Sequence, residues 1–151
     1  MQKLERFLVA VDFSQPSVRV AEIAADIARC RSAELVLLTV VEHIDSPQAR
    51  LARIAHNRYP NEPATLVVDE AVRAELCQLG ERLTAATGSP VACQVEVGEP
   101  AETILSFAER HAIDLIALGH TGRNRLVGAV LGSVAKRVID TAVCPVLVVR
   151  G

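Results

Sequence analysis

Residues 4–31 read LERFLVAVDFSQPSVRVAEIAADIARCR and join an apolar run to a segment of helical period. The run from Leu4 to Val11 has the length of a buried strand, and Asp12 ends it. Ser14 is a suitable N-cap, and Pro16 fits the first turn of the helix that follows. Apolar residues recur with helical spacing and predict the inward face of that helix: Val20, Ile23, Ile27 and Cys30. A strand followed by a helix is the repeating unit of an α/β fold.

The same unit recurs along the rest of the chain. Further strands are predicted by ELVLLTVV (34–41), VACQVEV (91–97), DLIALG (114–119) and CPVLVV (144–149). Helices are predicted from about residue 64 to 88, after Gly98-Glu99-Pro100, and from 133 to 141. The segment 42–63 has no clean period and is expected to be either a long loop or a loop with a short helix. Strands that are apolar on both faces need helices on both sides of the sheet. We therefore expect one α/β domain, residues 1–151, with an open, doubly wound, five-stranded parallel sheet of order 3-2-1-4-5.

Composition excludes several classes of partner. The formal net charge is −2, whereas a nucleic-acid-binding domain usually carries a basic excess. Aromatic residues make up 3% of the chain, which leaves few side chains on which bases could stack. No stretch approaches the roughly 18 consecutive apolar residues of a membrane span. We therefore expect a cytoplasmic domain that binds neither nucleic acid nor membrane.

The chain shows no pattern typical of covalent catalysis or of a metal site. Ser133 has no identifiable base partner, and the motif GxSxG is absent. The histidines and acidic residues form no group with the spacing of metal ligands. The four cysteines, which form no CxxC pair, are expected to be reduced, buried and structural: Cys30, Cys77, Cys93 and Cys144. We assign no catalytic residue and no metal ligand.

The most unusual segment is GHTGRNRLVGAVLGSVAKR, residues 119–137. Ligands of doubly wound sheets bind outside the carboxyl ends of the strands where the winding reverses, and the expected order places Gly119 there, beside Asp12. Gly119 and Gly122 are predicted to turn through positive φ, and Gly132-Ser133 to open a helix whose first amides bind phosphate. Positive charge nearby is expected from four side chains: Arg123, Arg125, Lys136 and Arg137. The alternative is that the glycines serve only to turn and cap the chain.

These residues carry a resemblance to a known family. The spacing Gly119-x2-Gly122-x9-Gly132-Ser133 resembles the ATP-binding signature G-2x-G-9x-G-[S/T] of the universal stress protein family. The segments VDFS (11–14), LLTVVE (37–42), GEPAETI (98–104) and CPVLVV (144–149) are similar to that family too. The resemblance spans the whole chain except residues 42–63, which lie where the family has its variable region.

The resemblance implies a role for each matching residue. Asp12 corresponds to the acidic residue at the end of the first strand, and Ala10 lies in the same adenosine-facing segment. Val40 corresponds to the residue whose backbone amide and carbonyl recognise adenine. The other matches would line the ribose and phosphates (Leu118, Gly119, Gly122) or donate to the phosphates (Gly132, Ser133, Val134). The implied ligand is ATP, with Mg²⁺ or Mn²⁺ bound through the phosphates, and the implied assembly is a homodimer that pairs Val146–Val149 of two subunits.

Three functions are open at this point: a dimeric, ATP-binding stress-response regulator, a slow ATP hydrolase in which Asp12 holds the metal, and a nucleotide-free dimer that acts through protein contacts.

Single residues have alternative roles as well. Asp12 is either a ligand residue or a cap of its turn, and His120 either a general base or an exposed loop residue. Arg123 and Arg125 either hold the γ-phosphate or are solvated.

Overall fold

The computed structural model describes residues 3–42, 64–121 and 130–150. In chain order the elements are β1 (Arg6–Ala10), α1 (Gln15–Arg31), β2 (Glu34–Val41), α3 (Ala64–Thr87), β3 (Val91–Val97), α4 (Pro100–Arg110), β4 (Leu115–Gly119), α5 (Ser133–Thr141) and β5 (Val146–Val149). The predicted start of α1 is confirmed, because the Ser14 side chain accepts from the amide of Ser17 and proline lies in the first turn. None of the helices within these ranges is both long and apolar enough to cross a bilayer.

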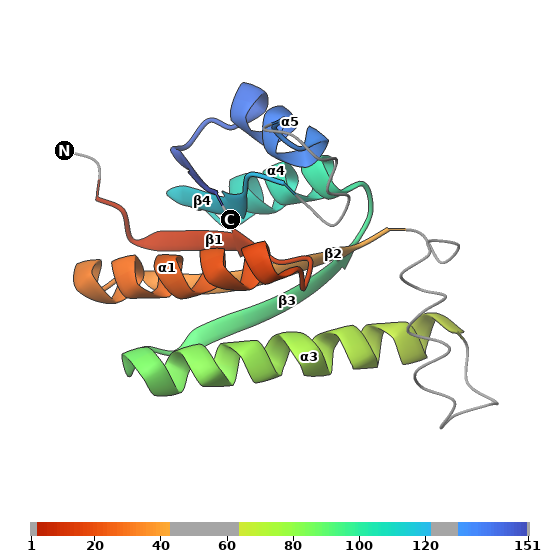
Figure 1. Cartoon of the computed structure of the whole chain (residues 1–151), viewed down its shortest axis with the longest axis horizontal. Helices are drawn as coiled ribbons and strands as arrows, with labels where there is room; N and C mark the ends of the chain where they lie inside the picture. The colour runs from red at the N-terminus through yellow and green to blue at the C-terminus, as the bar shows by residue number, and fades with distance from the viewer. Residues whose placement is uncertain (1–2, 43–63, 122–129, 151) are drawn as a thin grey trace.

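The five strands form one parallel sheet in the order β3-β2-β1-β4-β5, which confirms the predicted topology. β1 is the central strand, and Val9 lies opposite both Leu37 of β2 and Ala117 of β4. From β1 the chain winds toward β3 on one side and later toward β5 on the other (Figure 1). The winding therefore reverses between β1 and β4.

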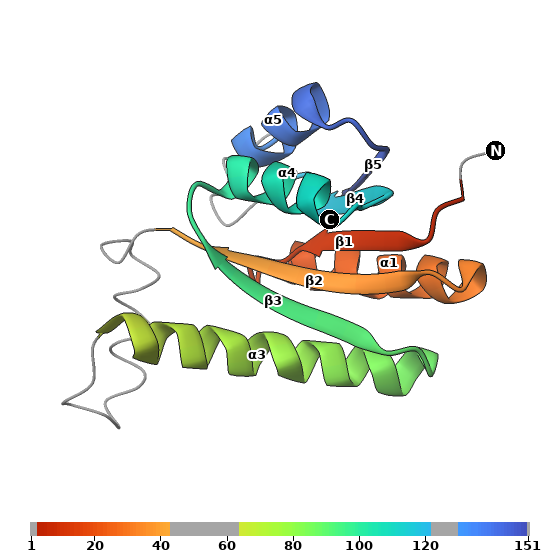
Figure 2. The same cartoon turned by 180° about the vertical axis from the view of Figure 1, so that it is seen from behind.

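Helices cover both faces of the sheet, as expected from the apolar strands (Figures 1 and 2). α1 and α3 pack on one face, where buried Val20 and Leu76 meet strand residues such as Val9. α4 and α5 pack on the other face, where Ile104 and Val138 meet strand residues such as Leu8. Successive residues of β1 enter opposite cores because side chains alternate along a strand.

The predicted inward face of α1 is confirmed at Val20, which is buried, but is wrong at Ile27 and Cys30. Ile27 is 37% exposed and Cys30 is exposed, whereas the sheet is met by small side chains of α1: Ser17, Val20, Ala21, Ala24, Ala25 and Ala28. Alanine ends at Cβ, so α1 can lie close to the strands. This closeness is visible at the end of β4, where a Cβ added to Gly119 would lie 4.0 Å from Cγ2 of Val20.

The expectation of buried cysteines is also wrong in part. All four thiols are free, as predicted, but Cys30 is exposed and the other three are half-buried. Cys93 of β3 lies against α3, where its Sγ is 3.5 Å from the carbonyl oxygen of Leu76. Burial of the thiol, together with the neighbouring Cys77 and Glu81, raises the pKa of Cys93 to about 11. At neutral pH this side chain is therefore a thiol and not a thiolate.

Gly80 allows this contact between α3 and β3. A Cβ added to Gly80 would lie 2.6 Å from Sγ of Cys93, which is closer than van der Waals contact allows. In a helix interior alanine is otherwise favoured over glycine by about 1 kcal/mol. Whether a Gly80→Ala substitution raises or lowers the free energy of unfolding should therefore depend on the residue at position 93.

We expect Gly80→Ala to lower the free energy of unfolding by about 1 kcal/mol, because the clash with Cys93 outweighs the helix propensity gained. In a Cys93→Ala background the same substitution should raise the free energy of unfolding, since the clashing sulfur is gone. Urea unfolding of the four proteins in this cycle measures both values. Equal effects of Gly80→Ala in the two backgrounds would contradict the contact.

Candidate functional site

The corner after β1 is built by hydrogen bonds among polar side chains. Oδ1 of Asp12 accepts from the amide of Ser14 at 3.0 Å and from its hydroxyl at 2.5 Å, and Ser14 in turn caps α1. Between them Phe13 has a φ of 61°, in the left-handed region that costs a residue with a side chain about 1 kcal/mol. The structure thus shows Asp12 in the capping role that the sequence left open. The half-buried carboxyl group is held in one position at the point where the winding reverses.

β2 continues past the end of β1 and leaves part of its edge open there. Pairing of β2 with β1 stops at Leu38, whose carbonyl accepts from the amide of Val11 at 2.9 Å, whereas pairing with β3 continues to Val41. The peptide groups of successive residues point to opposite sides of a strand. Those of Leu38 point toward β1, and the carbonyl of Val41 accepts from Gly98 on the β3 side. The amide and carbonyl of Val40 therefore point into the space beyond β1, and no backbone partner for them is found among the described residues.

β4 and the start of α5 are joined by backbone hydrogen bonds through the residue that follows Gly119. The His120 amide donates to the carbonyl of Val149, and the His120 carbonyl accepts from the amide of Gly132, both at 2.9 Å. The side chain of His120 is half-buried and not fully exposed. His120 thus fixes Gly132, the residue directly before α5, relative to the carboxyl ends of β4 and β5.

The predicted opening of a helix at Gly132-Ser133 is confirmed. Gly132 is the N-cap of α5, in an extended conformation with φ −62° and ψ 152°, and it provides no capping side chain. The first intrahelical bond runs from the Lys136 amide to the carbonyl of Gly132 at 2.9 Å, so the amides of Ser133, Val134 and Ala135 have no acceptor within the helix. Such amides, with the positive end of the helix dipole, can bind an anion.

The apolar residues predicted for the site lie together. Leu118 is buried, and it belongs to the core between the sheet and the helices α4 and α5. Ala10, Val40 and Val134 pack against that same core and are half-buried. Leu131, which the sequence analysis did not single out, lies there too. Aliphatic side chains from three strands and from α5 thus border one region at the winding reversal.

One predicted feature of the glycines is wrong. Gly119 does not have positive φ, since the described glycines with positive φ are Gly88 and Gly98. A Cβ at Gly119 would lie 3.5 Å from the nearest atom, the carbonyl oxygen of Thr121, which is an ordinary contact. The turn that follows β4 begins beyond Gly119. Gly122, Arg123 and Arg125 lie outside the described residues, as do residues 43–63 of the variable region.

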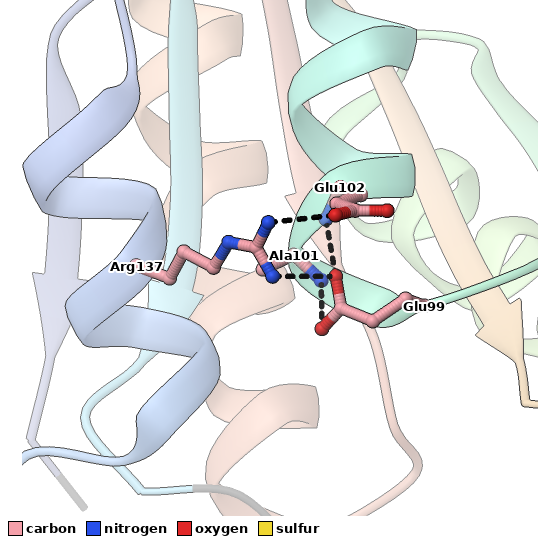
Figure 3. Close-up of polar contacts among 4 residues, drawn as sticks. All are labelled: Glu99, Ala101, Glu102 and Arg137. Atoms are coloured by element: carbon pink, nitrogen blue, oxygen red, sulfur yellow. Dashed lines mark hydrogen bonds and ion pairs between the residues drawn. The ribbon is translucent and has the colours of Figure 1, made fainter.

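The positive charge expected from α5 is neutralised by acidic partners. Nζ of Lys136 lies 2.5 Å from a carboxylate oxygen of Asp140, one helical turn away. Arg137 reaches across to the start of α4, where Nη2 is 2.7 Å from Glu102 and Nη1 is 3.4 Å from Glu99 (Figure 3). Any attraction for an anion from the described part of α5 therefore comes from its free amides and not from these two cations.

Glu99 both caps α4 and forms an ion pair with Arg137, and the sequence analysis assigned it neither role. Its carboxylate caps α4 by accepting from the amides of Ala101 at 3.3 Å and Glu102 at 2.8 Å, and the same group pairs with Arg137 (Figure 3). The segment Gly98-Glu99-Pro100 contains a signal for the cap, because Pro100 occupies the first helical turn. The link to α5 has no such local signal.

Comparison with known proteins agrees with this architecture. A family model described as the universal stress protein family matches residues 3–150. Universal stress protein MJ0531 of Methanocaldococcus jannaschii is 32% identical over 149 residues, which cover 97% of this chain and 82% of that protein. The solved structure of the universal stress protein UspA from Lactobacillus plantarum has a TM-score of 0.77 at 28% identity and covers 99% of this chain and 100% of its own.

Two other solved structures of this fold hold nucleotides. A universal stress protein in complex with cAMP has a TM-score of 0.71 and covers 99% of this chain and 98% of its own. The universal stress protein from Archaeoglobus fulgidus in complex with dAMP has a TM-score of 0.61, with coverage of 97% and 98%. Both are 22% identical to this chain, so their likeness concerns the fold. The match to the family model over nearly the whole length shows that this chain belongs to the universal stress protein family.

Proposed function

We propose that this chain is an ATP-binding universal stress protein, a single cytoplasmic domain that acts as a dimeric regulatory module in a stress response. The observation that carries the proposal is the start of α5. A nine-residue helix without a capping side chain begins beside the carboxyl end of β4, with three amides that have no intrahelical acceptor. This is where ligands of doubly wound sheets bind.

The proposed site combines phosphate donors with an adenine edge. The amides that begin α5 would bind the phosphates, and the peptide groups of Val40 offer one donor and one acceptor to a base. The bordering side chains are aliphatic, so the base would pack without aromatic stacking. We assign to the site Ala10, Asp12, Val40, Leu118, Gly119, Gly122, Gly132, Ser133 and Val134. Mg²⁺ or Mn²⁺ would be held by the phosphates.

Two further facts support an adenine nucleotide as the ligand. Proteins of the same fold have been solved with cAMP and with dAMP, so this architecture can accommodate an adenine base and a phosphate. The spacing of Gly119, Gly122, Gly132 and Ser133 resembles the signature of the ATP-binding branch of the family. Because Lys136 and Arg137 are paired with carboxylates, backbone donors and the bound cation would balance most of the phosphate charge.

The proposed dimer would form at the free edge of β5. The carbonyls of Pro145 and Val149 accept from Ile116 of β4 and from His120 directly after it, so the peptide groups of Val146 and Val148 point to the opposite edge, where the described residues place no further strand. Val143, just before this strand, is 87% exposed. An open, apolar strand edge favours pairing with another strand, and a second copy of β5 would satisfy it.

Gly132→Val tests the phosphate site. Its extended backbone angles are suitable for valine, so α5 should still form, but the branched side chain would stand where the phosphates approach. We expect the affinity for Mg·ATP, measured by isothermal titration calorimetry, to fall at least tenfold, or roughly 1.4 kcal/mol. Ala142→Val, at the other end of α5 with φ −60° and ψ 138°, is the matched control and should leave the affinity unchanged. Unchanged affinity in Gly132→Val would reject the site.

Asp12→Asn separates the capping role of Asp12 from a ligand role. The amide oxygen can still accept from Ser14, so the melting temperature should change little, whereas loss of the charge should weaken Mg·ATP binding by roughly tenfold. Ser14→Ala is the converse variant: loss of the cap should lower stability by about 1 kcal/mol and leave the affinity close to that of the wild type. If Asp12→Asn binds Mg·ATP normally, Asp12 only caps the turn.

Val148→Pro tests the proposed dimer. Proline removes an amide that points away from β4, so the sheet should be preserved, but the donor to a second subunit is lost. Analytical ultracentrifugation should show a dimer for the wild type and for Val148→Thr, and a monomer for Val148→Pro. A Val148→Pro protein that still sediments as a dimer would place the interface elsewhere.

A further inference from the structure

We propose that Cys77 and Cys93 form a peroxide-sensitive thiol pair that closes into an intrachain disulfide between α3 and β3. This proposal does not depend on nucleotide binding. It concerns the outer end of the sheet, where β3 is the edge strand and α3 covers it. The second half of α3 and the turn before β3 separate the two cysteines in sequence, so their proximity arises only in the folded chain.

The contact between α3 and β3 is close at this point. Sγ of Cys93 lies 3.5 Å from the carbonyl oxygen of Leu76, the residue directly before Cys77. A Cβ on Gly80 would be only 2.6 Å from the same sulfur, so the glycine lets the strand side chain approach the helix backbone. Cys77 directly follows Leu76 and precedes Gly80 by three residues, so it lies on the turn of α3 that faces the Cys93 sulfur, and its nearness contributes to the raised pKa of the Cys93 thiol. Leu76, Cys77 and Gly80, all on one turn of α3, thus lie around the Cys93 sulfur.

Both sulfurs can be reached from solvent. Cys77 and Cys93 are half-buried, and β3 is the edge strand of the sheet that the described residues form. The side chains of β3 alternate between half-buried and exposed along the strand. A small oxidant such as hydrogen peroxide can therefore approach without unfolding of the core. Cys30 and Cys144 lie on α1 and just before β5, and they provide internal controls within the same chain.

The reaction balances with one molecule of hydrogen peroxide. Cys77 loses its proton and its sulfur attacks one peroxide oxygen, the O–O bond breaks, and the released hydroxide takes up that proton, so the products are a Cys77 sulfenic acid and water. Cys93 then loses its proton and attacks the Cys77 sulfur, the S–O bond breaks, and the hydroxide leaves as a second water. Two thiols are oxidised to one disulfide while the peroxide is reduced to two waters. Burial keeps Cys93 protonated at neutral pH, with its pKa at about 11, so Cys93 is assigned the second step.

The expected consequence is a more stable protein with an unchanged ligand site. The disulfide would close the chain between residues 77 and 93 and restrict the unfolded state. Cys93 lies opposite Leu37 of β2, whereas Val40 lies opposite Glu96, farther along the strands toward their carboxyl ends. Oxidation should therefore raise the melting temperature and leave nucleotide affinity as it is in the reduced protein.

The test oxidises the reduced full-length chain with stoichiometric hydrogen peroxide, followed by alkylation, intact mass measurement and peptide mapping. We expect two of the four thiols to escape alkylation, a linked pair of peptides that contain Cys77 and Cys93, and a rise in melting temperature that dithiothreitol reverses. Cys77→Ser and Cys93→Ser should each abolish the link and the rise. Cys30→Ser and Cys144→Ser should retain both.

Three outcomes would overturn the proposal. They are full alkylation of all four thiols after peroxide treatment, a link that includes Cys30 or Cys144, and conversion of Cys77 or Cys93 to a sulfinic acid without a disulfide. Cys93→Ala serves as a second variant in case serine disturbs the contact with Leu76. Titration of the same samples with Mg·ATP tests the proposed function separately from the disulfide, because a protein that fails to bind ATP can still form the disulfide.

Discussion

The central position of β1 determines where the proposed ligand site lies in this protein. Phe7, Leu8 and Val9 have no exposed surface, because β2 and β4 pair with both edges of β1 and helices cover both of its faces. A strand enclosed in this way can carry polar groups only beyond its end. The first of them is Asp12, and it lies where the winding reverses. The corner from Asp12 to Ser14 follows directly from the enclosure of β1.

At this corner the folded chain exposes backbone groups more than charged side chains. The peptide edge of Val40 has no backbone partner among the described residues, and the first amides of α5 have no acceptor within the helix, because the elements beside them stop or begin there. The nearby cations of α5 are engaged in ion pairs with α4 or within α5 itself. Surface ion pairs of this kind contribute little stability, about 1 kcal/mol or less, but Arg137 also connects the middle of α5 to the start of α4, which packs on the same face. The proposed site would suit a ligand that has phosphates and a base with hydrogen-bond donors and acceptors. The affinity of the site for such a ligand would depend on the positions of the backbone groups.

Much of the fold was predictable because its signals are local. Apolar runs predict the strands, and Ser14, Pro16 and the Gly132-Ser133 pair mark helix starts that the structure confirms. The rotation of α1 was not predictable from period alone. Two faces of α1 have helical spacing: one holds Ile23, Ile27 and Cys30, and the other holds a stripe of alanines. The alanine face packs on the sheet because its smaller side chains let α1 lie close to the strands. The positions proposed for the apolar part of the site could be predicted, because each lies at or near the end of an element.

Sequence alone thus determined the order of strands and helices, the α/β class, the reversal between β1 and β4, and the helix start that follows it. These features depend on side-chain period, chain order and capping, all of which act between near neighbours. Only the tertiary structure decided which groups from distant segments meet. It paired Arg137 with Glu99 and Glu102, placed Cys93 against the turn of α3 that holds Cys77, and left the peptide groups of Val40 without a backbone partner among the described residues. The physical reason is that these contacts depend on the relative placement of packed helices and strands, which no single segment specifies.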